Sequence, residues 1–233
     1  MASMSNLSRL EQLAGWYANT PGVRALAQLV PNVGGAADML IMDNLERIRT
    51  ERAKTFFDEL AKGDTLLTPE LIQSEDFLHA YFATARAAFN TKQREKIRWF
   101  ARLLLAGSDS KSSLSLDDEF EDLLKILDEL SYQELSILAI LLNYESQIQK
   151  SVDETEPQWT KRFWTQFADE VFTKFQISPT ELDYVMTRIS RTATFVLYRT
   201  FGPLYLGNLG GQGKLTPIFH RLAQYIQCDR PSL

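Results

Sequence analysis

Large apolar residues recur every four positions along one stretch in the second half of the chain. They are Trp159, Phe163, Phe167, Val171 and Phe175. This spacing places them on one face of an α-helix, whereas a half-buried strand would alternate apolar and polar residues. The stretch therefore predicts an amphipathic helix that must bury its apolar face against other elements.

Helical patterns with start signals cover most of the rest of the chain. Ser178 is followed by Pro179 and, three residues on, by Glu181, which is a typical helix start, and Ser131 is a good N-cap for the run "YQELSILAILLNYE". No internal repeat interrupts this pattern. We therefore predict an all-α, mainly helical fold.

The C-terminal part adds a different signal. The β-branched and aromatic segment "TATFVLYRT" and the glycine-rich "GPLYLGNLGGQGK" predict a short two-stranded wing, after which Thr216-Pro217 begins a last helix. The only low-complexity segment, "SDSKSSLS", predicts a linker at residues 108–115. We therefore expect an N-terminal helical bundle at residues 1–107 and a second region at residues 116–233.

Composition narrows the class of protein. The 233 residues are 45% hydrophobic and 24% charged, as in a globular protein, and the net charge of -5 argues mildly against a dedicated nucleic-acid binder. The single cysteine, Cys228, cannot form an internal disulfide. No secretory signal and no long apolar run are visible. We expect a reduced, cytoplasmic protein.

Common catalytic motifs are missing from the sequence. There is no G-x-S-x-G elbow, no H-E-x-x-H and no P-loop. His79 and His220 each lie in an expected helix among apolar residues, and nothing in the spacing joins Cys228 to its one nearby candidate base, His220. We therefore predict a non-enzymatic protein with no catalytic residue, no metal ligand, no cofactor and no small-molecule substrate.

Charge is segregated along the chain. Basic residues gather between Arg86 and Arg102, and acidic residues between Asp117 and Glu134. This segregation allows three interpretations. The two stretches form solvated helix faces, the stretches attract each other across the linker, or the basic helix binds an acidic partner. For the last alternative we name Arg94, Arg98 and Arg102 as partner-binding residues.

Residues 21–42, which include "VPNVGGAADMLI", predict a tight corner between helices. Arg24, Gln28, Asn32 and Asp38 interrupt this segment too often for membrane insertion, which leaves adsorption to a membrane surface as the sharper alternative.

The order of expected elements over residues 118–228 resembles a winged helix-turn-helix. The segment "GKLTPIFHRLAQYI" is similar to the y-x-LTp-x-G segment that follows the wing in such regulators, except that Phe219 replaces the usual glycine. The resemblance places the helix Thr180–Thr194 in the recognition position and implies Arg188, Arg191, Arg199 and Lys214 as nucleic-acid-binding residues. The apolar Tyr184, Val185, Ile189 and Phe195 leave few polar positions to read bases.

The N-terminal half, with "PNVGGAAD" and a following arginine-rich helix, resembles uncharacterised all-helical bacterial proteins, some of them encoded near phage-defence or toxin genes. That resemblance implies a bacterial intracellular setting and carries no catalytic residue over.

Three hypotheses follow. The first is a regulatory protein of phage defence or toxin control that acts through protein–protein contacts or as a homo-oligomer. The second is a winged-helix transcriptional regulator that binds DNA, and the third is an effector at a membrane surface.

Overall fold

The computed structural model describes residues 36–63, 69–109, 112–198 and 212–227, without the side chains of residues 36–46 and of Pro69. The chain divides into two compact units, Met1–Asp117 and Asp118–Leu233. The division comes two residues after the end of the expected linker.

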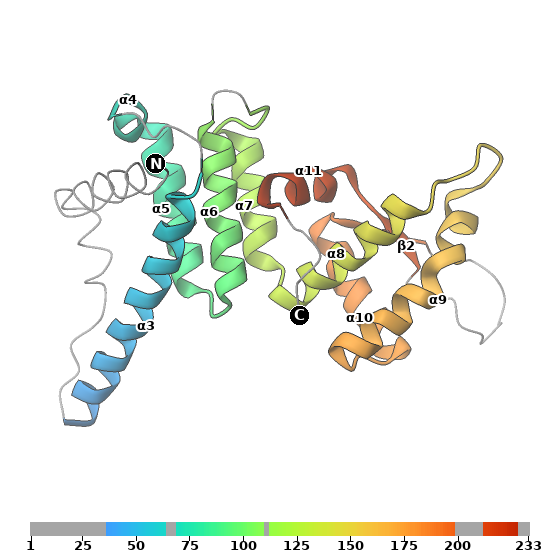
Figure 1. Cartoon of the computed structure of the whole chain (residues 1–233), viewed down its shortest axis with the longest axis horizontal. Helices are drawn as coiled ribbons and strands as arrows, with labels where there is room; N and C mark the ends of the chain where they lie inside the picture. Colours follow the sequence, from blue (N-terminus) through green and yellow to red (C-terminus); the bar gives the residue numbers. More distant parts are fainter. Residues whose placement is uncertain (1–35, 64–68, 110–111, 199–211, 228–233) are drawn as a thin grey trace, which may run out of the picture. The chain divides into compact units, whose positions relative to one another are not determined.

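The first unit is helical (Figure 1). Its described helices are α3 (Ala36–Leu60), α4 (Pro69–Gln73), α5 (Glu75–Asn90) and α6 (Arg94–Ser108). Ser74 begins α5, because its side chain accepts a hydrogen bond from the backbone N–H of Phe77. Helices α3, α5 and α6 pack against one another, and the short connection between α5 and α6 makes these two antiparallel neighbours.

Aromatic side chains fill the space between α3 and α5. The buried ring of Phe56 lies edge-on to Tyr81 at 6.3 Å and to Phe89 at 5.9 Å, measured between ring centroids. On α6, Ile97 and Phe100 are fully buried. Helices α3, α5 and α6 therefore each contribute apolar side chains to the core of this unit.

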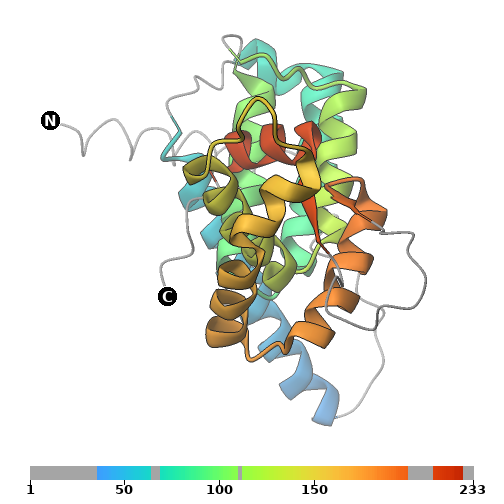
Figure 2. The same ribbon diagram turned by 90° about the vertical axis from the view of Figure 1, so that its right-hand side faces the viewer.

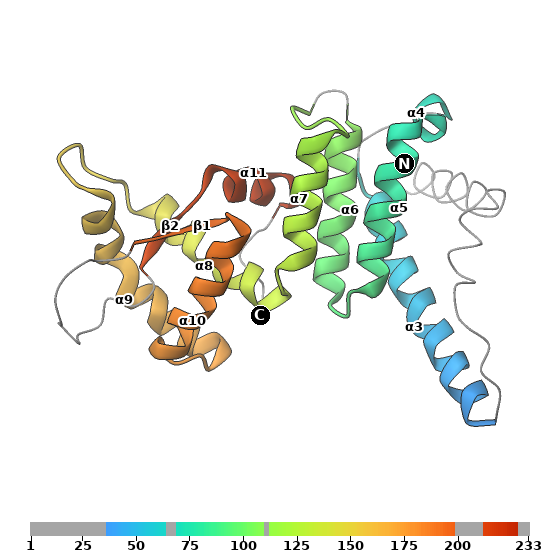
Figure 3. The ribbon, with the colours of Figure 1, turned by 180° about the vertical axis from the view of Figure 1, so that it is seen from behind.

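The second unit contains four longer helices, a small sheet and a last helix. In order they are α7 (Asp118–Glu129), α8 (Tyr132–Gln147), α9 (Glu156–Phe175), α10 (Pro179–Ile189), the single 3₁₀ turn η1 (Ser190–Thr192), β1 (Phe195–Leu197), β2 (Gly213–Leu215) and α11 (Pro217–Ile226). The two strands form an antiparallel hairpin in which Phe195 pairs with Leu215 and Leu197 with Gly213. Figure 3 labels both strands beside α8 and α9.

These elements confirm the predicted fold class. Within the described residues there are nine α-helices and one two-stranded sheet, and the sheet lies near the C-terminus. The order of helix, helix, helix, hairpin and helix from α8 onward is the one expected from the sequence. Figure 2 shows α11 following directly from β2.

The caps explain where the helices of the second unit begin. Ser131 and Ser178 each form a capping box with the glutamate three residues later, at the starts of α8 and α10. Helix α10 ends earlier than expected, at Ile189, because η1 follows it and Ala193 adopts a left-handed conformation with φ 58°.

The helix predicted from four-residue spacing forms the centre of this unit. Phe163, Phe167 and Val171 of α9 are fully buried. The ring of Tyr144 on α8 stacks on Phe163 with centroids 6.0 Å apart, and Trp164 lies 6.2 Å from Phe195 of β1. Helix α9 thus joins α8 on one side to the hairpin on the other.

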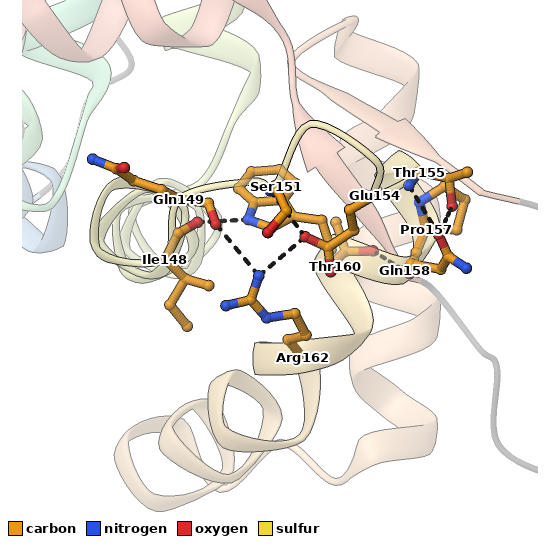
Figure 4. A network of polar contacts seen from close by, with 10 residues as sticks. Ile148, Gln149, Ser151, Glu154, Thr155, Pro157, Gln158, Thr160 and Arg162 are labelled. Atoms are coloured by element: carbon orange, nitrogen blue, oxygen red, sulfur yellow. Dashed lines mark hydrogen bonds and ion pairs between the residues drawn. The ribbon is translucent and has the colours of Figure 1, made fainter.

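The loop at residues 148–155, between α8 and α9, is held by side chains of α9 (Figure 4). The indole N–H of Trp159 donates to the backbone carbonyl of Ile148 at 2.5 Å. Nη1 of Arg162 lies 3.0 Å from Oε2 of Glu154. Because these bonds tie both ends of the loop to one helix, the spacing of α8 and α9 is fixed at this end of the pair.

Candidate functional site

Helix α10 has one buried face and one exposed face. Leu182, Met186 and Ile189 are buried in the core of the second unit. On the opposite side Tyr184, Arg188 and, in η1, Arg191 are exposed. Their spacing of four and three residues puts them in one row along the helix. We call these three residues the α10 stripe.

Tyr184 is the most unusual member of the stripe, because 74% of this aromatic residue is exposed. Within the described residues, the other exposed large apolar side chains are Val152, Phe172 and Val196, and all of them also belong to the second unit. Exposed aromatic residues beside arginine are typical of the centres of protein interfaces.

Arg188 is held in place by a glutamate from another helix. Its Nε and Nη2 groups both donate to the carboxylate of Glu134, whose side chain is only 5% exposed. The same carboxylate also accepts the backbone N–H and the hydroxyl of Ser131. Glu134 therefore caps α8 and fixes the direction of the Arg188 guanidinium, one edge of which stays exposed.

We expect Arg188→Ala to lower the free energy of unfolding of the protein by about 1–3 kcal/mol, because it leaves the buried Glu134 carboxylate without its cation. Arg188 is itself more than half exposed, so the effect falls below that of a fully buried pair. Arg191→Ala is the matched control and is expected to change stability by less than about 0.5 kcal/mol. Urea unfolding of the three proteins measures both values, and equal stability of the two variants would contradict the structural role of Arg188.

Of the other three residues predicted to bind nucleic acid, Lys214 lies on β2, Arg191 belongs to the α10 stripe, and the third is not described. Nζ of Lys214, in β2, is 3.2 Å from Oε1 of Glu156. Arg199 lies outside the described residues. Arg191 has no hydrogen bond or ion pair with the described part of the chain. The structure therefore brings Arg188 and Arg191 into one row, and ties Lys214 to an acid at the start of α9.

The charge of the second unit is unfavourable for binding DNA. Residues 1–117 carry 14 basic and 14 acidic side chains, whereas residues 118–233 carry 11 basic and 16 acidic ones. The whole net charge of -5 thus belongs to the unit that contains the α10 stripe, and this field opposes a duplex with its dense phosphates far more than a segment with one or two carboxylates.

The arginines predicted to bind a partner through α6 have acidic neighbours within the first unit. Arg94 lies 3.6 Å from Glu51 of α3, and Arg102 lies 2.7 Å from the buried Glu59 of the same helix. Burial alone would raise the pKa of Glu59, but its hydrogen bonds to Arg102 and Lys62 hold that pKa below the usual value.

Arg98 lies 3.8 Å from Glu95, one turn earlier on the same helix. All three of these arginines therefore have an acid within ion-pair distance, and Arg102 in addition supports the packing of α6 on α3. These contacts do not test the prediction that the three arginines of α6 bind an acidic partner.

A buried titratable group was not foreseen from the sequence. The side chain of Glu145, near the end of α8, is 6% exposed, and its carboxylate accepts the backbone N–H of Leu215 at 2.9 Å. Its Oε2 lies 3.6 Å from Nε2 of His220 on α11. No signal in the sequence marks Glu145, since Asn143 and Tyr144 separate it from the apolar run of α8.

Burial is the main reason why the pKa of Glu145 is raised to about 7, and the negative charge of Glu156 adds to the shift. The N–H of Leu215 and the charge of Lys214 oppose it. Burial also lowers the pKa of His220, so this imidazole is neutral at neutral pH. The two groups lie within ion-pair distance, and both shifts favour their neutral forms.

The histidines, the cysteine and the segment 21–42 singled out from the sequence form no common site within the described residues. His79 lies exposed on α5, far in sequence from His220, and Cys228 is outside the described residues. No three metal-binding side chains gather among the residues whose placement is given. Of the segment 21–42, only residues 36–42 are described, as part of α3.

None of the helices in the described ranges is both long and apolar enough to cross a membrane. Comparison with family models, curated proteins and solved structures finds no match to this chain.

Proposed function

We propose that the second unit is a non-enzymatic protein-binding module, and that the α10 stripe holds an acidic segment of a partner protein. The observation that carries this proposal is the exposed Tyr184 ring in one row with two arginines, one of which is fixed in direction by Glu134.

The chemistry of the stripe suits a peptide that carries carboxylates beside an apolar side chain. Tyrosine offers a large contact area with little loss of conformational entropy, and arginine binds carboxylates through two parallel hydrogen bonds. Arg188 is already oriented, so less entropy is lost when its exposed edge pairs with a second acid. Arg191 supplies a cation that has no partner in the described part of the chain.

The order of elements supports the DNA-binding alternative, because α10 precedes the hairpin as a recognition helix precedes the wing. The charges argue against it. Lys214 and Arg188 already lie against Glu156 and Glu134, and DNA affinity depends on neutralising several phosphates, whereas a peptide segment needs only one or two carboxylate contacts.

Selection of peptides from a random library on the immobilised full-length protein tests the proposal. We expect enrichment of sequences that combine aspartate or glutamate with one aromatic or aliphatic residue. The double variant Tyr184→Ala/Arg191→Glu is expected to lose the selected peptides, because it removes the contact area and reverses one charge of the stripe.

Two controls make the selection decisive. Asp153→Ala/Lys161→Ala changes two exposed residues outside the stripe and is expected to retain the peptides. Circular dichroism checks that each variant is folded. Peptides that bind the wild-type protein and the stripe variant equally well would overturn the assignment of the surface.

A further inference from the structure

Three glutamates of the described residues have nearly buried side chains, and they differ in their partners. Glu59 is 6% exposed and faces Arg102 and Lys62. Glu134 is 5% exposed and faces Arg188. Glu145 is equally buried, yet its carboxylate is bonded by a backbone N–H and faces the imidazole of His220.

A buried carboxylate without a cation in contact favours its neutral form, since a charge that has lost its water needs a compensating partner. The raised pKa of Glu145 agrees with this geometry. Among the described residues, Glu145 is the one of these three buried glutamates with no lysine or arginine at ion-pair distance.

The position of Glu145 gives its charge a structural consequence. In the hairpin the backbone N–H of Thr216 donates to the carbonyl of Thr194 at 3.0 Å. The N–H of Tyr198 donates to the carbonyl of Gln212 at 2.7 Å. The N–H of Leu215, between these, points away from β1, because successive N–H groups of a strand alternate in direction. Glu145, near the end of α8, thus accepts a backbone N–H on the edge of β2 that does not face β1.

Charged and titratable groups surround Glu145 on each element packed there. Lys214 of β2 and Glu156 of α9 both influence its pKa, and His220 lies on α11. Nζ of Lys150, in the loop after α8, lies 3.1 Å from Glu156.

The Tyr198 hydroxyl, just after β1, is buried without a hydrogen-bond partner among the described residues. Its pKa is raised, first by burial and then by the charges of Glu156 and Glu145. Lys214 and Lys150 both lie against Glu156. An ionised Glu145 would therefore add a second negative charge beside two lysines that already pair with Glu156.

We propose that Glu145 is a proton-controlled latch on the hairpin. Its neutral carboxyl accepts the Leu215 N–H at no cost of burying a charge, and so holds β2 and the start of α11 against α8. Loss of the proton strengthens that single bond but leaves a buried negative charge without a described lysine or arginine at ion-pair distance, and the pull of this charge toward water loosens both. The latch is independent of the partner binding proposed above.

A displacement of β2 would also affect the elements bonded to Thr216. Thr216 follows β2 and caps α11, and its hydroxyl also donates to the carbonyl of Ala193 at 2.7 Å. Ala193 is the left-handed residue that ends η1. A displaced β2 therefore releases the first turn of α11 and the backbone after η1 together.

NMR titration of the full-length wild-type protein tests the latch directly. We expect the side-chain carboxyl carbon of Glu145 and the amide of Leu215 to titrate together with a midpoint at about pH 7. After correction for the intrinsic rate, hydrogen-exchange protection of the Thr216 amide is expected to fall roughly tenfold between about pH 6 and about pH 8.

Three variants separate the latch from other causes. Glu145→Gln keeps an acceptor for the Leu215 N–H and is expected to abolish the pH dependence of protection. Glu129→Gln changes an exposed acid of α7 and should behave like the wild-type protein. His220→Gln should retain the Glu145 transition, since the carboxyl and not the imidazole is the titrating group.

The proposal is overturned by a Glu145 midpoint near that of an ordinary carboxyl group, or by protection that falls equally in wild type and Glu145→Gln. Loss of the transition in His220→Gln would assign the effect to the imidazole and would also overturn it. The wild-type titration stands alone if a variant fails to fold.

Discussion

Replacing Gly213 with alanine is expected to lower the free energy of unfolding of the second unit by about 3 kcal/mol, at the upper end of overpacking costs. A Cβ at this position would lie 2.0 Å from the backbone oxygen of Val196 and 2.3 Å from the ring of Phe195. The hairpin cannot give way easily, because Gly213 pairs with Leu197 and Phe195 packs against Trp164. Denaturant unfolding followed by circular dichroism measures the loss.

Gly63→Ala in the first unit is the matched control. Its Cβ would lie 2.6 Å from a terminal methyl of Leu105, which can move to another rotamer, so we expect a change within about 1 kcal/mol. Neither glycine has a left-handed backbone conformation, so the comparison measures crowding alone. Equal stability of the two variants would contradict the close approach of the strands.

Glu145→Gln is expected to make the protein more stable than wild type at about pH 8, by about 3 kcal/mol at most, and to change little at about pH 4.5. The folded-state pKa of Glu145, about 7, lies above its ordinary value of 4.5. The stabilisation that comes from the protonated carboxyl is thus fully present below pH 4.5 and is lost as pH rises through 7. Glutamine stays neutral throughout and still accepts the Leu215 N–H.

Thermal or urea unfolding at several pH values measures this difference. His220 acts in the opposite direction: its lowered pKa gives a stabilisation that is present above its ordinary pKa of 6.5 and lost as pH falls. Because the imidazole lies 3.6 Å from the carboxylate, repeating the comparison in a His220→Gln background isolates Glu145. A variant that is less stable than wild type at about pH 8 would show that the ionised carboxylate stabilises the fold.

The helices of this chain are largely readable from its sequence, because a helix depends on neighbours three and four residues apart. The spacing of Phe163, Phe167 and Val171 predicted α9, and Ser131 and Ser178 predicted the starts of α8 and α10. The short two-stranded wing was also predicted, but its three-residue strands are much shorter than the strand-like runs of the sequence.

The candidate site was less predictable, because its contacts join distant positions. Glu134 and Arg188 are 54 residues apart, and Glu145 and Leu215 are 70 apart. Nothing local marks these glutamates as buried, since each becomes so only when α10 or the hairpin packs on α8. The sequence suggested the arginines of α10 as site residues, but not that Glu134 would fix one of them.

Fluorescence anisotropy with two labelled probes tests the role of the α10 stripe most directly. The probes are a short duplex DNA and an acidic peptide from the selection, each titrated with the full-length protein over a salt series. We expect saturable binding of the peptide that Tyr184→Ala/Arg191→Glu abolishes, and no saturable binding of the duplex at low salt. Salt-dependent binding of the duplex that the same variant abolishes would contradict a protein-binding stripe and would identify α10 as a DNA-binding helix.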